Sequence, residues 1–199
     1  ITLPEERKYE LGRFSFLEQK KYILNIGVLF AKKNQKKLVE MLPYISEDLV
    51  LVSSGEKEPY ATEVRDTVEK LNLQNRVHFL KNISEEEKYA LIQNCQAMCH
   101  PSIAEGFGIP PIEAMAFGKP IISTSIQGSG VDWVNLDNVS GVIVPPKKTK
   151  ELADAIINLL NDNKKYKRLS EGAKKRYKEE FTKDKMVEKF ENLYLEILK

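Results

Sequence analysis

Short apolar runs alternate with longer amphipathic stretches along most of this chain. The runs are rich in Ile, Leu and Val and end near Gly, Pro or Ser, which is the pattern of buried strands. They lie at Tyr22–Val28, Leu49–Val52, Arg76–Leu80, Ala97–His100, Pro120–Ser123 and Gly141–Val144. Apolar residues at helical spacing occupy Lys33–Met41, Tyr60–Leu71 and Ser84–Gln93. This alternation predicts an α/β fold with a doubly wound parallel sheet of about six strands.

The two ends of the chain depart from this pattern. Residues 1–20 are polar and show no sustained period, which predicts a remnant of a linker or strand. After the last predicted strand, two apolar stripes at helical spacing predict helices. They consist of Leu152, Ala155, Ile156, Leu159 and Leu160, and then of Met186, Val187, Phe190, Leu193, Tyr194, Ile197 and Leu198. We therefore divide the chain into a linker remnant at 1–20, an α/β domain at 21–180 and a terminal helix at 181–199.

The composition is that of a globular protein. The 199 residues suit one well-buried α/β domain better than two, and 42% hydrophobic with 30% charged residues is an ordinary balance. No run approaches the roughly 20 apolar residues of a membrane span. A net charge of +2 argues against strong nucleic-acid binding. Because the chain starts at Ile1 without an initiator Met or a signal-peptide pattern, we expect it to be a piece of a longer protein.

The charge is unevenly distributed along the chain. Residues 147–199 hold 15 Lys and Arg against 10 Asp and Glu, a net +5, which leaves 16 against 19, a net −3, for the remainder. A solvated helical face is the favoured interpretation of this basic segment. The alternative is a peripheral contact with anionic lipid at the inner face of the membrane.

The two cysteines, Cys95 and Cys99, lie four residues apart and next to His100. A metal site would need further ligands in a second cluster, so no metal is expected. Cys95 falls at the end of a predicted helix and Cys99 falls in a predicted strand. Both are expected to be reduced core residues, which suits a cytoplasmic protein.

A glycine-rich turn between two acidic residues is the strongest candidate site. Gly106 and Gly108 lack a Cβ, so the main chain can approach a bound group closely. The Pro110–Pro111 pair suits the first turn of a helix, whose free amide groups attract anions. Glu105 comes directly before the turn, and Glu113 falls in the opening turns of the helix.

Glu105-Gly106-Phe107-Gly108, followed by Glu113-Ala114-Met115-Ala116, closely resembles the E-x7-E signature of the retaining glycosyltransferases of family 4. Those enzymes have the two-domain GT-B architecture, and the signature lies in their C-terminal, donor-binding domain. The resemblance extends over roughly Tyr22–Leu160 and implies a Rossmann-like domain that forms one half of a GT-B enzyme. It also implies that the terminal helix at 181–199 crosses back to an N-terminal acceptor domain that this chain lacks.

A second match covers Gly27–Asn34, which looks like the family's first strand and loop, where basic side chains meet the donor's pyrophosphate. Many members carry Arg directly after the glycine, whereas this chain has Val28. Lys32 and Lys33 resemble the Arg-Lys pair of one subgroup, which implies phosphate-binding roles for both. The segment around Lys81 resembles the one whose main chain lies near the nucleobase.

The resemblance implies transfer of a hexose, with retention, from a nucleoside-diphosphate sugar to a glycan or lipid-linked acceptor in cell-surface polysaccharide synthesis. GDP-mannose and UDP-sugars are the leading donors, and no metal or other cofactor is implied. Glu113 would bind the ribose hydroxyls, Glu105 would hold the sugar, and Lys33 would neutralise the departing diphosphate. The implied donor-binding residues are Lys32, Lys33, Lys81, Gly106, Phe107, Gly108, Ile109 and Glu113, and the implied catalytic residues are Glu105 and Lys33.

Two other functions stay open. One is a non-catalytic module that senses a nucleotide-sugar, and the other is a different GT-B-like enzyme, such as a sugar-nucleotide epimerase or a phosphorylase. A dinucleotide-binding oxidoreductase is less favoured, because no Gly-x-Gly-x-x-Gly follows the first strand. We interpret His78, His100 and Trp133 as structural residues, and Ser102 has no His and Asp partners for a nucleophilic triad.

Overall fold

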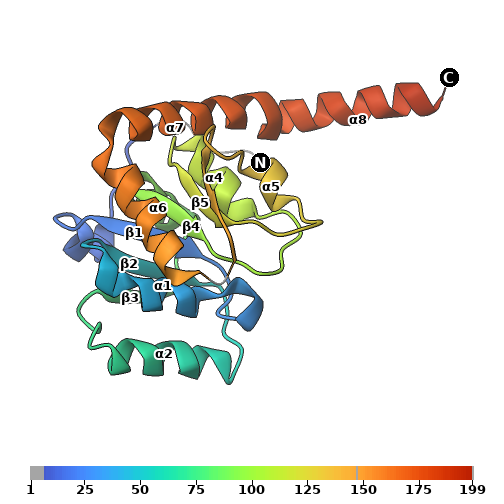
Figure 1. Cartoon of the computed structure of the whole chain (residues 1–199). Helices are drawn as coiled ribbons and strands as arrows, with labels where there is room; N and C mark the ends of the chain where they lie inside the picture. The colour runs from blue at the N-terminus through green and yellow to red at the C-terminus, as the bar shows by residue number, and fades with distance from the viewer. Residues whose placement is uncertain (1–6, 147, 199) are drawn as a thin grey trace.

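The computed structural model describes residues 7–146 and 148–198. Its centre is a six-stranded sheet in the order β3-β2-β1-β4-β5-β6, and every neighbouring pair is parallel (Figure 1). The strands are β1 (Tyr22–Ile26), β2 (Asp48–Ser53), β3 (Val77–Lys81), β4 (Ala97–His100), β5 (Ile121–Thr124) and β6 (Gly141–Val144). Each predicted strand is present with its ends shifted by two residues at most, so the predicted α/β class with a parallel sheet is confirmed.

The strand order reverses beside β1, which pairs with β2 on one side and with β4 on the other. In parallel sheets ligands bind beyond the carboxyl ends of the strands at such a point. The loops that follow β1 and β4 meet there. The amide of Ile103 donates to the carbonyl of Lys32 at 2.8 Å, and the Asn34 side chain donates to the carbonyl of Pro101 at 3.1 Å.

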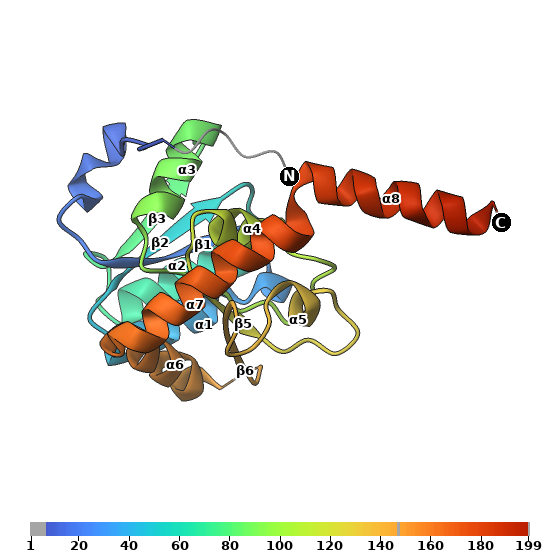
Figure 2. The ribbon, with the colours of Figure 1, turned by 90° about the horizontal axis from the view of Figure 1, so that it is seen from above.

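Helices cover both faces of the sheet, so its strands are apolar on both sides. The first core cluster joins one face to α1 (Gln35–Met41), α2 (Tyr60–Lys70) and α6 (Thr149–Asn161). The second joins the other face to α3 (Glu85–Asn94) and α4 (Ile109–Ala116). The helix α7 (Asn163–Arg176) contributes to both clusters and lies across the domain in Figure 2. Neighbouring residues of β1 divide between the clusters, with Ile23 in the first and Leu24 in the second.

Two predicted helix starts have clear local causes. The helix expected from Lys33 begins at Gln35, because a 3-10 turn, η2 (Ala31–Lys33), precedes it and Asn34 adopts a left-handed conformation with φ 57°. The capping box before α3 is confirmed. The Ser84 hydroxyl accepts from the amide of Glu87 at 3.2 Å, and the Glu87 carboxylate accepts from the amide of Ser84 at 2.7 Å.

The described part of the N-terminal segment packs on the domain. Residues 1–6 lie outside the described residues, but the 3-10 helix η1 (Gly12–Leu17) and the residues before it pack on the domain. Tyr9 contacts the ring of Tyr89 at a centroid distance of 5.6 Å. In the described part of 1–20, sparse apolar side chains thus reach the core although they show no helical or strand period. The buried ones are Tyr9, Leu11, Phe14 and Leu17.

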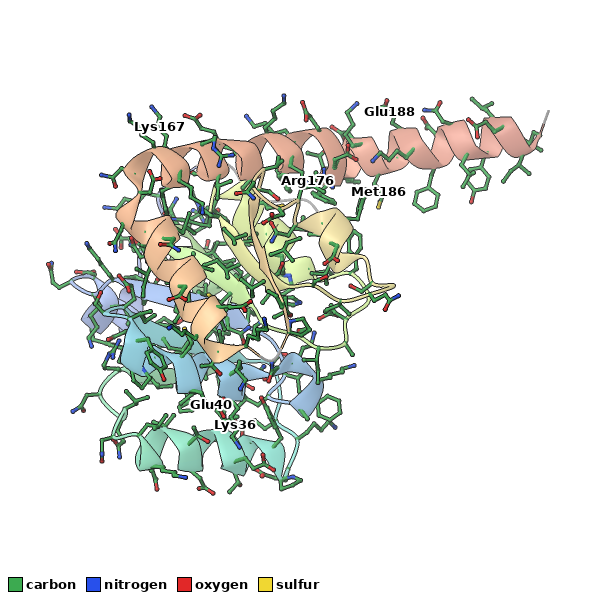
Figure 3. The ribbon with its side chains drawn as sticks, viewed as in Figure 1. Lys36, Glu40, Lys167, Arg176, Met186 and Glu188 are labelled. Atoms are coloured by element: carbon green, nitrogen blue, oxygen red, sulfur yellow. The ribbon has the colours of Figure 1, made fainter. Side chains whose placement is uncertain are left out.

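The C-terminal helix α8 (Lys183–Ile197) follows a π-helical turn, η4 (Tyr177–Phe181), and projects away from the domain (Figure 1). None of its side chains in 183–197 is buried. Met186 and Glu188 lie on opposite edges of the helix in Figure 3, as expected for an amphipathic helix. No helix in the described part of the chain is long and apolar enough to cross a membrane. The predicted stripe is thus present and stays uncovered within this chain.

Candidate functional site

The glycine turn leads directly into α4, as predicted. Gly108 has a φ of 90°, which side chains rarely tolerate, and a Cβ built there would lie 3.5 Å from Nε2 of His100. The turn is braced from the far side by Gly130, whose amide donates to the carbonyl of Gly106 at 2.8 Å. A Cβ on Gly130 would meet that carbonyl oxygen at 2.8 Å, so the contact requires glycine. The turn is held in place by main-chain geometry.

A polar cavity of about 640 Å³ opens beyond the ends of β1, β2 and β3, between the start of α3 and the start of α4. We call it the polar cavity. Three predicted site residues line it: Lys81, Ile109 and Glu113. Its other lining residues are Ile26, Val52, Ser53, Ser54, Gly55, Glu56, Asn82, Ile83, Ser84, Glu85, Lys88 and Pro110. It lies at the edge of the sheet where the strand order places a ligand.

Glu113 is the most buried acid of the polar cavity, with 7% of its surface exposed. The ammonium of Lys88 lies 2.7 Å from its Oε1. Burial raises the pKa of Glu113, and the hydrogen bond and charge of Lys88 oppose that rise. Sequence reasoning missed Lys88, because its link to Glu113 joins α3 to α4 and leaves no local signal.

Glu105 forms a second ionic cluster on the other side of the turn. Its Oε2 pairs with the ammonium of Lys33 and lies 3.2 Å from Nε2 of His100, while its Oε1 accepts from the amide of Gly106 at 3.1 Å. The hydrogen bond from His100, followed by that from Lys33, lowers the pKa of Glu105 to about 2 against the opposing effect of burial. The loops after β1 and β4 are thus joined by an ion pair between two predicted catalytic residues.

His100 is closer to the candidate site than the sequence suggested. Its side chain is 3% exposed, and Nε2 also lies 3.3 Å from the Ser102 hydroxyl. The sequence shows only that His100 ends a short apolar strand. The contact with Glu105 depends on the path of the loop between the two residues, which the sequence pattern does not indicate. His78, by contrast, pairs with Asp48 at 2.9 Å, which agrees with its structural interpretation.

The other predicted basic residues lie apart from this cluster. The Lys32 side chain is exposed, and its ammonium lies 5.6 Å from the ring centroid of Phe30. Lys81 reaches the polar cavity and pairs with Glu56 at 2.7 Å. Glu56, which also pairs with Arg65 at 2.5 Å, was not anticipated from the sequence.

Phe107 faces a different hollow, an apolar cavity of about 500 Å³ between the turn, η4 and α8. We call it the apolar cavity. Trp133, on the short helix α5 (Val131–Val134), stacks on Phe107 at a centroid distance of 5.8 Å and is 46% exposed. Phe181 meets Trp133 edge-on at 5.1 Å. Ile109 lines both cavities, so the start of α4 separates a polar hollow from an apolar one.

The cysteines are core residues, as predicted. Cys95 and Cys99 are free thiols and fully buried, and burial raises the pKa of Cys95 to about 12. Within residues 7–146 and 148–198, no group of three or more His, Cys, Asp or Glu side chains is arranged to hold a metal ion.

Most of the chain matches one family of known proteins. Residues 10–176 match the family model described as Glycosyl transferases group 1. The chain is 36% identical over 152 residues to the O-antigen chain mannosyltransferase C of Escherichia coli, which covers 75% of this chain and 40% of that protein. It is 32% identical over 164 residues to the D-rhamnosyltransferase WbpZ of Pseudomonas aeruginosa, which covers 81% of this chain and 42% of that protein. The chain therefore spans about two fifths of the length of these relatives.

Solved structures with a similar fold include the sucrose-phosphate synthase from Thermosynechococcus elongatus. The match has a TM-score of 0.82 at 24% identity, and it covers 96% of this chain and 50% of the synthase chain. The Anabaena protein Alr3699/HepE in complex with UDP-glucose matches with a TM-score of 0.79 at 24% identity. This match covers 93% of this chain and 54% of the Anabaena chain. These likenesses show the fold and confirm the predicted Rossmann-like class.

Proposed function

Because this chain belongs to the glycosyl transferases of group 1, we propose that it is the donor-binding domain of a retaining, family 4 hexosyltransferase of the GT-B type. The observation that carries the proposal is the position of Glu113, a buried acid in a polar cavity beyond the strand ends at the reversal of strand order. We propose a nucleoside-diphosphate sugar as the donor, with GDP-mannose or a UDP-sugar as the candidates. Relatives named as mannosyltransferases support mannose as the sugar, and a structural neighbour in complex with UDP-glucose supports a UDP-sugar.

In this proposal the polar cavity takes the nucleoside. Glu113 accepts hydrogen bonds from the ribose hydroxyls, and the β3–α3 loop with Lys81 lies along the base. The diphosphate then crosses the start of α4, where the amides after Gly106 face it. The sugar lies beside Glu105, which orients its anomeric carbon.

The cations would act on the leaving diphosphate. Lys33 shares its charge with Glu105 before the donor arrives, and Lys32 adds a second charge from the same loop. A fixed positive group at the place where negative charge develops lowers the transition-state barrier by about 3 kcal/mol. The proposed reaction needs no metal and no other cofactor, since these lysines and amides neutralise the diphosphate.

The acceptor side of the reaction belongs to a second domain in this proposal. The chain covers about two fifths of its relatives, and the apolar stripe of α8 is exposed. We propose that an N-terminal domain of the same protein binds a glycan or lipid-linked acceptor and packs on this helix. The protein would act in the cytoplasm on cell-surface polysaccharide synthesis, with a peripheral contact at the inner membrane face.

Thermal-shift screening of the full-length protein with GDP, UDP, GDP-mannose and UDP-sugars tests this function. We expect one base to raise the unfolding temperature, and its sugar conjugate to raise it further. Transfer should require the full-length protein, and the 199-residue chain alone should transfer little. Stabilisation by none of these ligands would contradict donor binding, and a pyridoxal phosphate absorbance band would indicate a phosphorylase instead.

A further inference from the structure

Lys88 has a position in the polar cavity that the proposed nucleotide contacts do not use. It lies in the first turns of α3, and its ammonium lies 2.7 Å from Oε1 of Glu113 on α4. The same ammonium lies 3.0 and 2.8 Å from the two carboxylate oxygens of Glu85. The Lys88 side chain is only 14% exposed, whereas that of Glu85 is 72% exposed. Lys88 therefore bridges an outer and an inner carboxylate.

The hydrogen-bonding capacity of Lys88 is matched by these two acids. An ammonium group has three N–H donors, and three carboxylate oxygens lie within 3.0 Å of this one. Lys88 is thus suited to hold Glu113 rather than to bind a ligand directly. Removing one partner of such a buried pair leaves the other charge uncompensated, so the contact matters to Glu113.

The other charges of the polar cavity cannot replace Lys88. Lys81, at the end of β3, pairs with Glu56 in the loop after β2 at 2.7 Å. Glu85, on α3, is negative and acts against ionisation of Glu113. Among the described residues that line the polar cavity, Lys88 is the cation in contact with Glu113.

We propose that Lys88 is a positioning residue for Glu113. Anchored by Glu85, the Lys88 ammonium fixes one oxygen of Glu113 and keeps that carboxylate ionised. The second oxygen of Glu113 is then left for the vicinal hydroxyls of a nucleoside. This inference rests on the proposed function. Its consequence is a pH dependence of nucleotide binding. A protonated Glu113 loses acceptor capacity, so affinity falls as the pH falls through the pKa of Glu113. Without Lys88 the pKa is higher, and the fall begins at a higher pH.

The test compares Lys88→Met and Lys88→Arg in the full-length protein, with GDP and UDP as probes and calorimetry between pH 5 and pH 8. At a pH below the pKa of Glu113, each unit by which that pKa increases lowers the affinity for the nucleotide by about tenfold. We expect Lys88→Met to shift the affinity profile to higher pH and Lys88→Arg to restore much of it. Lys148→Met is the matched control, because Lys148 forms an i,i+3 pair with Glu151 on α6 and does not line the polar cavity.

A second measurement does not need a ligand. Carboxyl NMR of ¹³C-labelled glutamate, with the Glu113 signal identified by its loss in Glu113→Gln, gives the pKa directly. It should rise in Lys88→Met and stay unchanged in Lys148→Met. An unchanged Glu113 pKa and an unchanged affinity profile in a natively folded Lys88→Met protein would overturn the inference. If wild-type protein bound neither nucleotide, the proposed function would fail, while the carboxyl titration would still decide whether Lys88 controls Glu113.

Discussion

The two cavities on either side of the α4 entrance are built in different ways. The polar cavity is lined by strand ends and by α3 and α4, which are anchored in the second core cluster. The apolar cavity depends on η4 and on α8, whose Met186, Phe190 and Leu193 are about half exposed. The lining residues of the polar cavity thus lie on the folded domain, whereas α8 supplies one wall of the apolar cavity. We therefore assign the proposed nucleoside contacts to the first cavity, and expect the second to respond to changes in α8.

The largest expected effect is that of Glu113→Ala. Hydrogen bonds to a charged acceptor contribute about 1.5–3 kcal/mol, so loss of the ribose contacts should weaken nucleotide binding by about 100-fold. Calorimetry with the nucleoside diphosphate measures this. Glu151→Ala, on the exposed start of α6, is the control and should bind like wild type. Equal affinities for Glu113→Ala and wild type would remove the polar cavity from the proposed site.

A smaller and more selective effect is expected for Glu105→Ala. Because Glu105 is proposed to hold the sugar, affinity for the nucleotide-sugar should fall by about tenfold. The free nucleotide should bind at least as tightly as before, because Lys33 loses its resting partner. Titrations of both ligands against the same variant give the comparison. Equal losses for the two ligands would show that Glu105 and Glu113 do not act on opposite ends of one donor.

The pairing of Glu105 also predicts a dependence of stability on pH. Its pKa is lowered to about 2 in the folded protein, so its ionised form contributes stability above the ordinary pKa of 4.5, and this contribution is lost as the pH falls from there through about 2. His100→Asn removes the hydrogen bond that contributes most to the lowered pKa of Glu105. We expect the acid-unfolding midpoint, followed by circular dichroism, to move to higher pH in this variant. In Glu105→Gln, which has no carboxylate to titrate, the same His100→Asn change should move the midpoint less, and an equal shift in both backgrounds would assign the effect to general destabilisation.

The smallest effect should come from the helix beside the apolar cavity. Phe190 is 53% exposed, so Phe190→Ser should change the free energy of unfolding of this chain by no more than about 0.5 kcal/mol. Met115→Ala, in the second core cluster, should cost about 2–5 kcal/mol. Denaturant unfolding of both variants tests the contrast. A large loss for Phe190→Ser would show that α8 is part of the folded domain rather than a surface for a partner.

The fold was predictable because its signals are local. Each strand is a short apolar run, and the capping box of Ser84 and Glu87 marks the start of α3 within four residues. The turn before α4 was predictable for the same reason, since its glycines and prolines are adjacent. The N-terminal segment was missed, because Tyr9 and Phe14 have no period and reach the core only through tertiary packing.

The candidate site was predictable only in part. Glu105, Lys33 and Glu113 could be named from the resemblance, but the contacts of His100 with Glu105 and of Lys88 with Glu113 could not. Lys88 is 25 residues from Glu113, and no spacing rule relates positions on two different helices. His100 was interpreted as a structural residue, because the end of a strand does not show which residues the following loop brings next to it. Such partners depend on how elements pack, and a single sequence does not carry that information.

The ion pair of Lys33 with Glu105 has a consequence for phosphate compounds that are not donors. Every oxygen of Glu105 already has a donor in the resting protein, and the ammonium of Lys33 is neutralised before any anion approaches. A small free anion such as sulfate would have to separate the two charges and could offer nothing to Glu105 in return. In the proposed complex, a sugar conjugate would bring hydroxyls for the carboxylate and oxygens for the ammonium at once. If the proposed function holds, the resting charge balance would favour ligands that satisfy both groups.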